Sequence, residues 1–250
     1  MGRFNCIIFF CLIISSLTTS VFSSESTKIT IANNCNGTIW PAILPTAGQP
    51  PLNGGGGFVL RRGRQESVEA PKWWSGRIWA RQGCNFDNSG RGTCQTGDCD
   101  GELRCGGVSG QPPATVVDLT LGTETNPIHY YDVSLVDGFN LPVAVIPAGG
   151  SSGGCGVAAC EADVNVACPE RLAVRRGGKV VGCESPCLAI GEDEYCCRGA
   201  YAGRAACKPT AYARTVKAVC PRALSYAYDE SRGLNTCRAR RYIVTFCPPN

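Results

Sequence analysis

Several features that mark particular classes of protein are scarce in this chain. It contains one histidine, and charged residues make up only 18% of it, for a formal net charge of +4. No run of basic residues is longer than two, so neither composition nor patterning favours a nucleic-acid partner. After the first 25 residues no apolar stretch reaches the length of a transmembrane helix, and we expect no membrane span. If an N-terminal signal peptide is removed, the length of the remaining chain allows one or two domains.

The first 24 residues have the organisation of a secretory signal peptide. Arg3 provides a positive start, residues 6–14 form an apolar run too short to cross a bilayer, and residues 20–24 are mostly small. We therefore expect residues 1–23 to be a signal peptide and the protein to be secreted. An N-terminal anchor or a buried helix is the alternative interpretation of this run.

Cysteine, in contrast, is abundant: there are 18, of which two lie in the predicted signal peptide, leaving 16. An even number in a chain bound for an oxidising compartment predicts eight disulfides. A zinc site is the alternative, because Cys94 and Cys99, or Cys183 and Cys187, have nearly the spacing of metal ligands. The single histidine, the lack of a repeated C-x-x-C pair and the oxidising destination argue against zinc. We expect no metal and no organic cofactor.

Short β patterns dominate the first two thirds of the chain and return at its end. Segments that alternate or are rich in β-branched residues are expected to form strands at 28–32, 77–81, 115–121, 130–136 and 242–246. Turn sequences separate them, at 53–57, 111–113, 137–138 and 148–154. Short strands separated by such turns predict a mostly β protein, a sandwich or a barrel, without βαβ units.

The composition shifts near Gly154 toward a cysteine-rich, loop-rich segment that has too little core to fold without disulfides. We expect residues 24–154 and 238–250 to form a β-sandwich domain and residues 155–237 to form a separate small lobe. Helices are predicted in the lobe from about residue 158 to residue 167, and from Thr210 to Pro221.

Four segments carry a family resemblance. Residues 90–105, 131–142, 194–197 and 242–248 closely resemble signatures of the thaumatin-like family, the fifth group of plant pathogenesis-related proteins, which includes osmotin. All 16 cysteines of the expected mature chain fall in the family's order, so the resemblance covers the whole of that chain.

The resemblance implies a flattened β-sandwich, a small disulfide-rich helical lobe and a cleft between them. It also implies the pairing of the cysteines, which spacing alone leaves open. The implied pairs are Cys35–Cys247, Cys84–Cys94, Cys99–Cys105, Cys155–Cys237, Cys160–Cys220, Cys168–Cys183, Cys187–Cys196 and Cys197–Cys207.

Members with antifungal activity line the cleft with one arginine and four carboxylates. Carried over to this chain, these positions are Arg77, Asp118, Asp132, Asp137 and Glu230. The family has a glutamate where this chain has Asp118, one methylene shorter. The family's last aspartate falls at Glu230 by spacing, with Asp229 beside it.

Geometry limits how two of these acids can meet. On a straight strand Asp132 and Asp137 would point to opposite faces and lie ~16 Å apart. They can share a cleft only if the chain bends at Asp137-Gly138, a dipeptide typical of turns.

Clustered carboxylates around one arginine can serve three purposes. They can accept hydrogen bonds from sugar hydroxyls, they can supply the acid and the nucleophile or base of a glycoside hydrolase, or they can form an ordinary solvated rim. An arginine neighbour opposes the raised pKa that a general acid needs, and the shorter Asp118 disturbs attack geometry, so we do not assign catalysis.

The favoured interpretation is a secreted, monomeric plant defence protein with antifungal activity that binds β-1,3-glucan or another fungal wall or membrane component. A weak endo-β-1,3-glucanase is one alternative, and a stress-associated protein or enzyme inhibitor without a glucan role is the other. Vacuolar members often carry a C-terminal extension, and only three residues follow Cys247 here, so the apoplast is the expected location.

Other side chains carry weaker expectations. The lone histidine, His129, is expected to be a polar residue at a strand edge. Tryptophans 73, 74 and 79 could stack on sugars, but core packing is favoured. Asn36 begins a glycosylation sequon. The basic residues 238, 240 and 241 are expected to form a solvated face.

Overall fold

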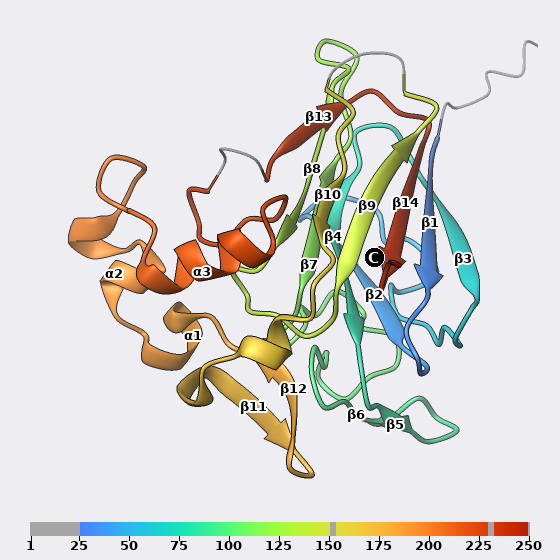
Figure 1. Cartoon of the computed structure of the whole chain (residues 1–250). Helices are drawn as coiled ribbons and strands as arrows, with labels where there is room; N and C mark the ends of the chain where they lie inside the picture. Colours follow the sequence, from blue (N-terminus) through green and yellow to red (C-terminus); the bar gives the residue numbers. More distant parts are fainter. Residues whose placement is uncertain (1–25, 151–153, 230–232, 250) are drawn as a thin grey trace, which may run out of the picture.

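The computed structural model of this chain describes residues 26–150, 154–229 and 233–249. The predicted signal peptide, residues 1–23, and the predicted site residue Glu230 lie outside the described residues. Two five-stranded sheets form the body of the molecule, and short helices and a hairpin form a lobe on one side of it (Figure 1). In the described part of the chain, no helix is long and apolar enough to cross a membrane. The predicted mostly β fold class is confirmed.

The first sheet joins the two ends of the chain. Its strands, in spatial order, are β10 (Ala158–Cys160), β9 (Val143–Ala148), β14 (Arg241–Phe246), β1 (Thr27–Asn33) and β3 (Gln65–Ala70). β14 runs parallel to β1, and the other neighbours are antiparallel. The last strand therefore returns to the β-sheet system, as predicted from its sequence.

The second sheet carries most of the residues assigned to the predicted cleft. Its order is β13 (Asn235–Cys237), β8 (His129–Ser134), β7 (Val116–Thr120), β4 (Ser75–Arg81) and β2 (Trp40–Pro45), and all its pairs are antiparallel. With β1 and β14, the strands β4, β7 and β8 confirm the five predicted strands. β10 and β13 lie within residues 155–237, yet both extend the sheets of the sandwich.

The main core contains the alternating apolar residues of both sheets. In β1, Ile29 and Ile31 are fully buried, and in β7 and β8 the buried residues include Val117 and Val133. Full burial of one such side chain contributes about 1.5–3 kcal/mol. Because side chains alternate along a strand, the residues between these positions lie on the outer faces of the sheets.

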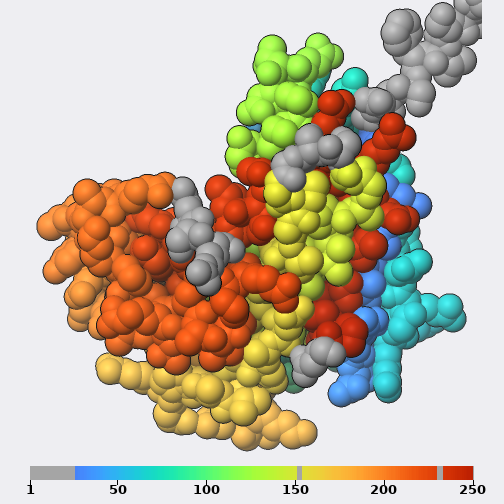
Figure 2. Space-filling view, turned by 45° about the horizontal axis from the view of Figure 1, so that its top comes forward, coloured from blue at the N-terminus to red at the C-terminus, as the bar shows by residue number. Residues whose placement is uncertain are grey.

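The lobe contains eight short elements: η1 (Val164–Ala167), η2 (Glu170–Leu172), β11 (Ala173–Arg176), β12 (Lys179–Cys183), α1 (Pro186–Ile190), α2 (Asp193–Cys196), η3 (Gly199–Tyr201) and α3 (Ala211–Val219). Figure 2 shows the orange part of this lobe projecting to one side of the sandwich. α3 confirms the helix predicted from Thr210, whose side chain accepts a hydrogen bond from the Ala213 amide.

The helix predicted over residues 158–167 is wrong. Residues 158–160 form β10, whose backbone pairs with β9, and only residues 164–167 form a 3₁₀ turn. All three residues of β10 are buried, and Cys160 is bonded to Cys220. Pairing with β9 and burial on the sandwich outweigh the helical propensity of a segment this short.

All eight disulfides form in the pairing that the family resemblance implies. Cys35–Cys247 closes a loop of 212 residues, which in the chain-entropy model contributes roughly 5 kcal/mol. The shortest, Cys99–Cys105, spans 6 residues and contributes about 2 kcal/mol in the same model. The short bridges hold loops that bury little apolar surface.

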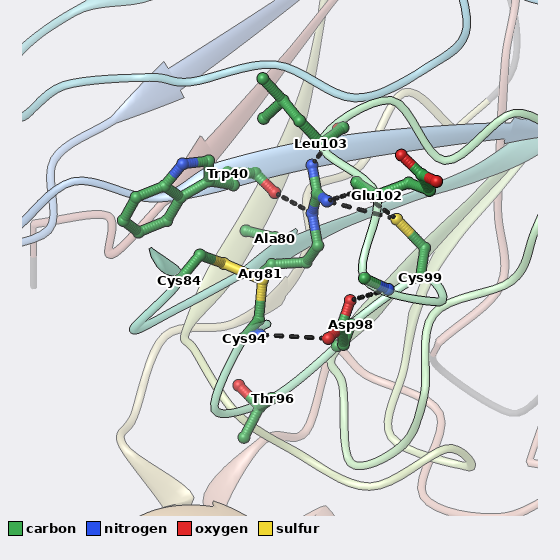
Figure 3. Close-up of a disulfide and its surroundings, with 12 residues drawn as sticks. Trp40, Ala80, Arg81, Cys84, Cys94, Thr96, Asp98, Cys99, Glu102 and Leu103 are labelled. Atoms are coloured by element: carbon green, nitrogen blue, oxygen red, sulfur yellow. Dashed lines mark hydrogen bonds between the residues drawn. A yellow bond between two sulfur atoms is a disulfide. The ribbon is translucent and has the colours of Figure 1, made fainter. Parts of the chain in front are cut away.

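Arg81, at the end of β4, is a fully buried cation that anchors one such disulfide-bonded loop. Its guanidinium donates to the carbonyl oxygens of Trp40, Glu102 and Leu103 at 3.1, 2.8 and 2.8 Å (Figure 3). Burial lowers the pKa of Arg81 to about 10, although nearby Asp98 acts in the opposite direction. These bonds attach the loop to the edge of the second sheet, where β2 lies.

Candidate functional site

Three of the predicted site residues lie side by side on the outer face of the second sheet. Arg77 in β4 is the register partner of Asp118 in β7, which is in turn the partner of Asp132 in β8. Residues directly opposite each other have Cβ atoms ~5 Å apart and point to the same face. Their neighbours Ile78 and Val117 are buried in the main core, so this row points away from it.

Asp137 joins this row because the chain turns immediately after β8. The Gly138 amide donates to the Leu135 carbonyl at 3.0 Å, and Gly138 has a φ of +81°, which favours glycine. A Cβ at Gly138 would also come within 2.6 Å of the Cys183 carbonyl oxygen. The predicted bend at Asp137-Gly138 is confirmed. This bend brings the Asp137 side chain close to Arg77.

Arg77 bridges two of the acids. Its Nε donates to Asp118 Oδ1 at 3.1 Å, and one of its terminal nitrogens donates to Asp137 Oδ2 at 3.2 Å. The three side chains are 48%, 36% and 37% exposed, so both ion pairs are open to solvent. We call Arg77, Asp118, Asp132 and Asp137 the acidic row.

Asp132 is the exception in the acidic row because it is only 7% exposed. Its Oδ1 is buried and has no hydrogen-bond partner among the described residues. Burial, followed by the charge of Asp118, raises the pKa of Asp132 to about 7, and Arg77 opposes the shift. Asp132 therefore holds its proton in mildly acidic surroundings.

Burial also raises the pKa of Asp118, and Asp137 adds to the rise, but the charge and hydrogen bond of Arg77 counteract it. The row thus combines one buried acid of raised pKa with two exposed acids that share one guanidinium. Such a set offers several exposed acceptor oxygens and one potential donor, the proton of Asp132.

The fifth predicted acid, Glu230, lies outside the described residues, but its neighbour Asp229 is described. Asp229 is 5% exposed, and its Oδ2 accepts from the Ser225 amide and hydroxyl at 2.9 and 2.8 Å. Lys217 Nζ lies 3.0 Å from the same oxygen. Asp229 therefore connects α3 to the segment that follows it.

The structure also shows where the residues with weaker expectations lie. His129 is the first residue of β8 and is buried, and its Nδ1 lies 3.0 Å from the Tyr242 hydroxyl. Trp74 and Trp79 are buried as favoured, while Trp73 is 47% exposed. Asn36 is exposed, and so are the basic residues 238, 240 and 241.

Sequence reasoning missed a pocket in the lobe. It has a volume of about 380 Å³ and lies among η2, α1, α2 and the start of α3. The apolar residues that line it come from four short segments separated by loops. No periodic pattern in the sequence links them, so only the folded structure brings them together.

A β-sandwich with a small helical lobe, eight disulfides and an acidic row on one outer face defines a thaumatin-type protein. The thaumatin family model matches residues 33–248, and this chain belongs to the thaumatin family.

Named relatives cover nearly the whole chain. It is 49% identical over 228 residues to a thaumatin-like protein of Arabidopsis thaliana, covering 90% of this chain and 91% of the relative. It is 48% identical over 230 residues to pathogenesis-related protein 5 of the same plant, covering 92% and 94%. Among solved structures, the thaumatin-like xylanase inhibitor TLXI aligns with a TM-score of 0.49 and 25% identity, covering 88% of this chain and 99% of that one.

Proposed function

We propose that this protein acts in plant defence, outside the cell, by binding β-1,3-glucan or a related fungal wall component through the acidic row. Membership of the thaumatin family, with a pathogenesis-related protein among the relatives, supports the defence role. Eight disulfides and the predicted signal peptide support secretion, because such bonds persist in oxidising compartments.

The observation that carries the proposal is the chemistry of the acidic row. Asp118 and Asp137 each present a carboxylate that is more than a third exposed, and both are held in place by Arg77. Carboxylates accept hydrogen bonds from hydroxyl groups, and charge-assisted bonds are the stronger ones. A glucan offers many hydroxyls in a regular spacing, which suits a row of fixed acceptors.

Asp132 lies directly opposite Asp118, but it is only 7% exposed, and its Oδ1, for which the described residues supply no partner, is buried. We therefore expect the direct hydrogen bonds to a glucan to come from Asp118 and Asp137, with Asp132 behind them.

Binding to laminarin, a soluble β-1,3-glucan, tests the proposal. The double variant Asp118→Asn/Asp137→Asn keeps size and hydrogen-bonding capacity but removes both exposed charges. We expect it to bind laminarin at least about tenfold more weakly, because bonds to a charged acceptor are replaced by bonds to a neutral one. Glu66→Gln is the matched control, since Glu66 is an exposed acid on β3 of the other sheet. Equal binding by the double variant and the control would contradict the role of the acidic row.

A second candidate function is weak hydrolysis of the same glucan, which the raised pKa of Asp132 favours. Asp132 could act as the general acid, and Asp118, with its Cβ ~5 Å away, as the nucleophile or base. The low exposure of Asp132 argues against its reaching a glycosidic oxygen. An increase in reducing ends from laminarin that disappears in Asp132→Asn would establish hydrolysis. Laminarin that stays bound to the protein without producing new reducing ends would establish binding alone.

A further inference from the structure

The pocket in the lobe is separate from the acidic row. Its volume of about 380 Å³ lies at the small end of the range for ligand sites, and none of the four acidic-row residues lines it. Its walls come from four elements, η2, α1, α2 and α3, and these are held together by disulfides such as Cys187–Cys196. Figure 1 shows the three α-helices grouped on one side of the sandwich.

The pocket is lined by both apolar and polar side chains. Leu172 and Pro186 are buried side chains of its wall, and Tyr212 is half-buried. The Tyr212 hydroxyl donates to the Glu184 carbonyl at 3.4 Å, so its polar end is engaged elsewhere and its ring is free to contact a ligand. Apolar walls beside convergent polar groups are typical of small-molecule sites.

Most of the charged side chains of the pocket are cationic. Arg171 and Arg214 both line it, against one carboxylate, Glu194. Among the described residues, no carboxylate forms an ion pair with either arginine. A terminal nitrogen of Arg214 donates to the Pro209 carbonyl at 2.6 Å, which holds the side chain in place and leaves its other nitrogens available.

We propose that this lobe pocket is a second binding site, which takes small carboxylates with an apolar body. The carboxylate would be bound by Arg171 and Arg214, since guanidinium groups match carboxylates with paired hydrogen bonds. The apolar body would lie against Leu172, Pro186 and Tyr212. The net charge of the lining side chains, two arginines against one glutamate, disfavours a cationic ligand of the same shape.

Two pairs of probes test the proposal on the oxidised protein. Cinnamate and cinnamyl alcohol share an aromatic body, while decanoate and decanol share an aliphatic one. We expect at least one carboxylate to shift the amide NMR signals of residues 186–195 and 209–214 saturably. Its alcohol partner is expected to bind about tenfold more weakly, because it lacks the charge-assisted bonds to the arginines. The stronger of the two carboxylates shows which body the pocket prefers.

Substitutions locate the interaction. Arg171→Gln/Arg214→Gln should weaken carboxylate binding by about tenfold or more and leave alcohol binding unchanged. Arg176→Gln is the matched control, because Arg176 is an exposed arginine of the same lobe outside the pocket. If the double variant does not fold, Arg171→Gln alone still tests the pocket, since Arg171 makes no hydrogen bond to another described side chain.

Four results would overturn the proposal: no saturable shift with either carboxylate, shifts confined to other parts of the protein, equal affinity for acid and alcohol, or unchanged affinity in the arginine variants. Because the probes contain no sugar, these results are independent of laminarin binding at the acidic row.

Discussion

Asp118 and Asp132 lie directly opposite each other on β7 and β8, yet only Asp118 is paired with a cation. Arg77 holds Asp118 at 3.1 Å, while Asp132 is 7% exposed and has one oxygen without a partner among the described residues. Burial raises the pKa of both acids, but Arg77 counteracts the rise through a direct hydrogen bond only at Asp118, because Asp132 is buried and has no ion pair in the described part of the chain.

This difference predicts a pH-dependent stability. The pKa of Asp132 is about 7 in the folded protein, above the usual 3.8, so the folded state holds a proton that the unfolded state releases. The resulting stabilisation is fully present below about pH 4 and is lost as the pH rises through 7. Asp132→Asn should raise the free energy of unfolding at pH 8 by about 4 kcal/mol, because each pKa unit corresponds to about 1.4 kcal/mol, and should change it little at pH 4. Urea unfolding at both pH values measures this, and a gain of equal size at both would refute the assignment.

Arg77 is expected to control the titration of its partner. Arg77→Met removes the cation that opposes the effect of burial, so the pKa of Asp118 should rise further. The NMR titration of the Asp118 carboxyl carbon measures the change directly. Because both ion pairs are exposed, the loss of stability should not exceed about 1 kcal/mol. Arg61→Met, at an exposed turn, is the control that should leave Asp118 unchanged.

Strand positions could be predicted because strand alternation is a local signal. The sequence predicts β1, β4, β7, β8 and β14 from their alternating or β-branched residues, although β4 and β8 each end in four consecutive buried residues. The segment 158–167 could not be predicted in this way. Its first three residues owe their strand conformation to pairing with β9, and neither composition nor periodicity within so short a segment reveals that pairing.

Some features of the acidic row could likewise be predicted from the sequence, and others could not. The bend at Asp137-Gly138 was readable from its turn sequence, and the family resemblance supplied the positions of the acids. The burial of Asp132 was not readable, because it depends on what packs over β8 and not on its own strand. The lobe pocket was invisible for a similar reason, since Arg171 and Arg214 belong to elements separated by two helices and several loops.

Lys217 and Asp229 form an ion pair that should contribute to the stability of the lobe. Their side chains are 22% and 5% exposed, and Lys217 also donates to the Ala223 carbonyl at 2.8 Å. Lys217→Met leaves Asp229 without this cation in a buried position, and we expect a loss of about 2 kcal/mol. Thermal unfolding of Lys217→Met, compared with that of Lys179→Met, measures this loss. Lys179 is an exposed lysine of β12. A loss no larger than that of Lys179→Met would show that the ion pair does not contribute to the stability of the lobe.

Arg81 is expected to be the least replaceable cation of the sandwich. Its three carbonyl acceptors belong to Trp40 on β2 and to Glu102 and Leu103 on the disulfide-bonded loop, and it has no exposed surface (Figure 3). Arg81→Lys retains the charge, but a compact ammonium cannot reproduce the planar fork that reaches acceptors on two sides. We expect Arg81→Lys to lose about 3 kcal/mol of unfolding free energy, because part-buried carbonyls lose their donors. Arg91→Lys, at a largely exposed side chain, should lose less than about 0.5 kcal/mol. Chemical denaturation with the disulfides intact makes the comparison, and similar losses in the two variants would show that charge, not the shape of the guanidinium, secures the loop.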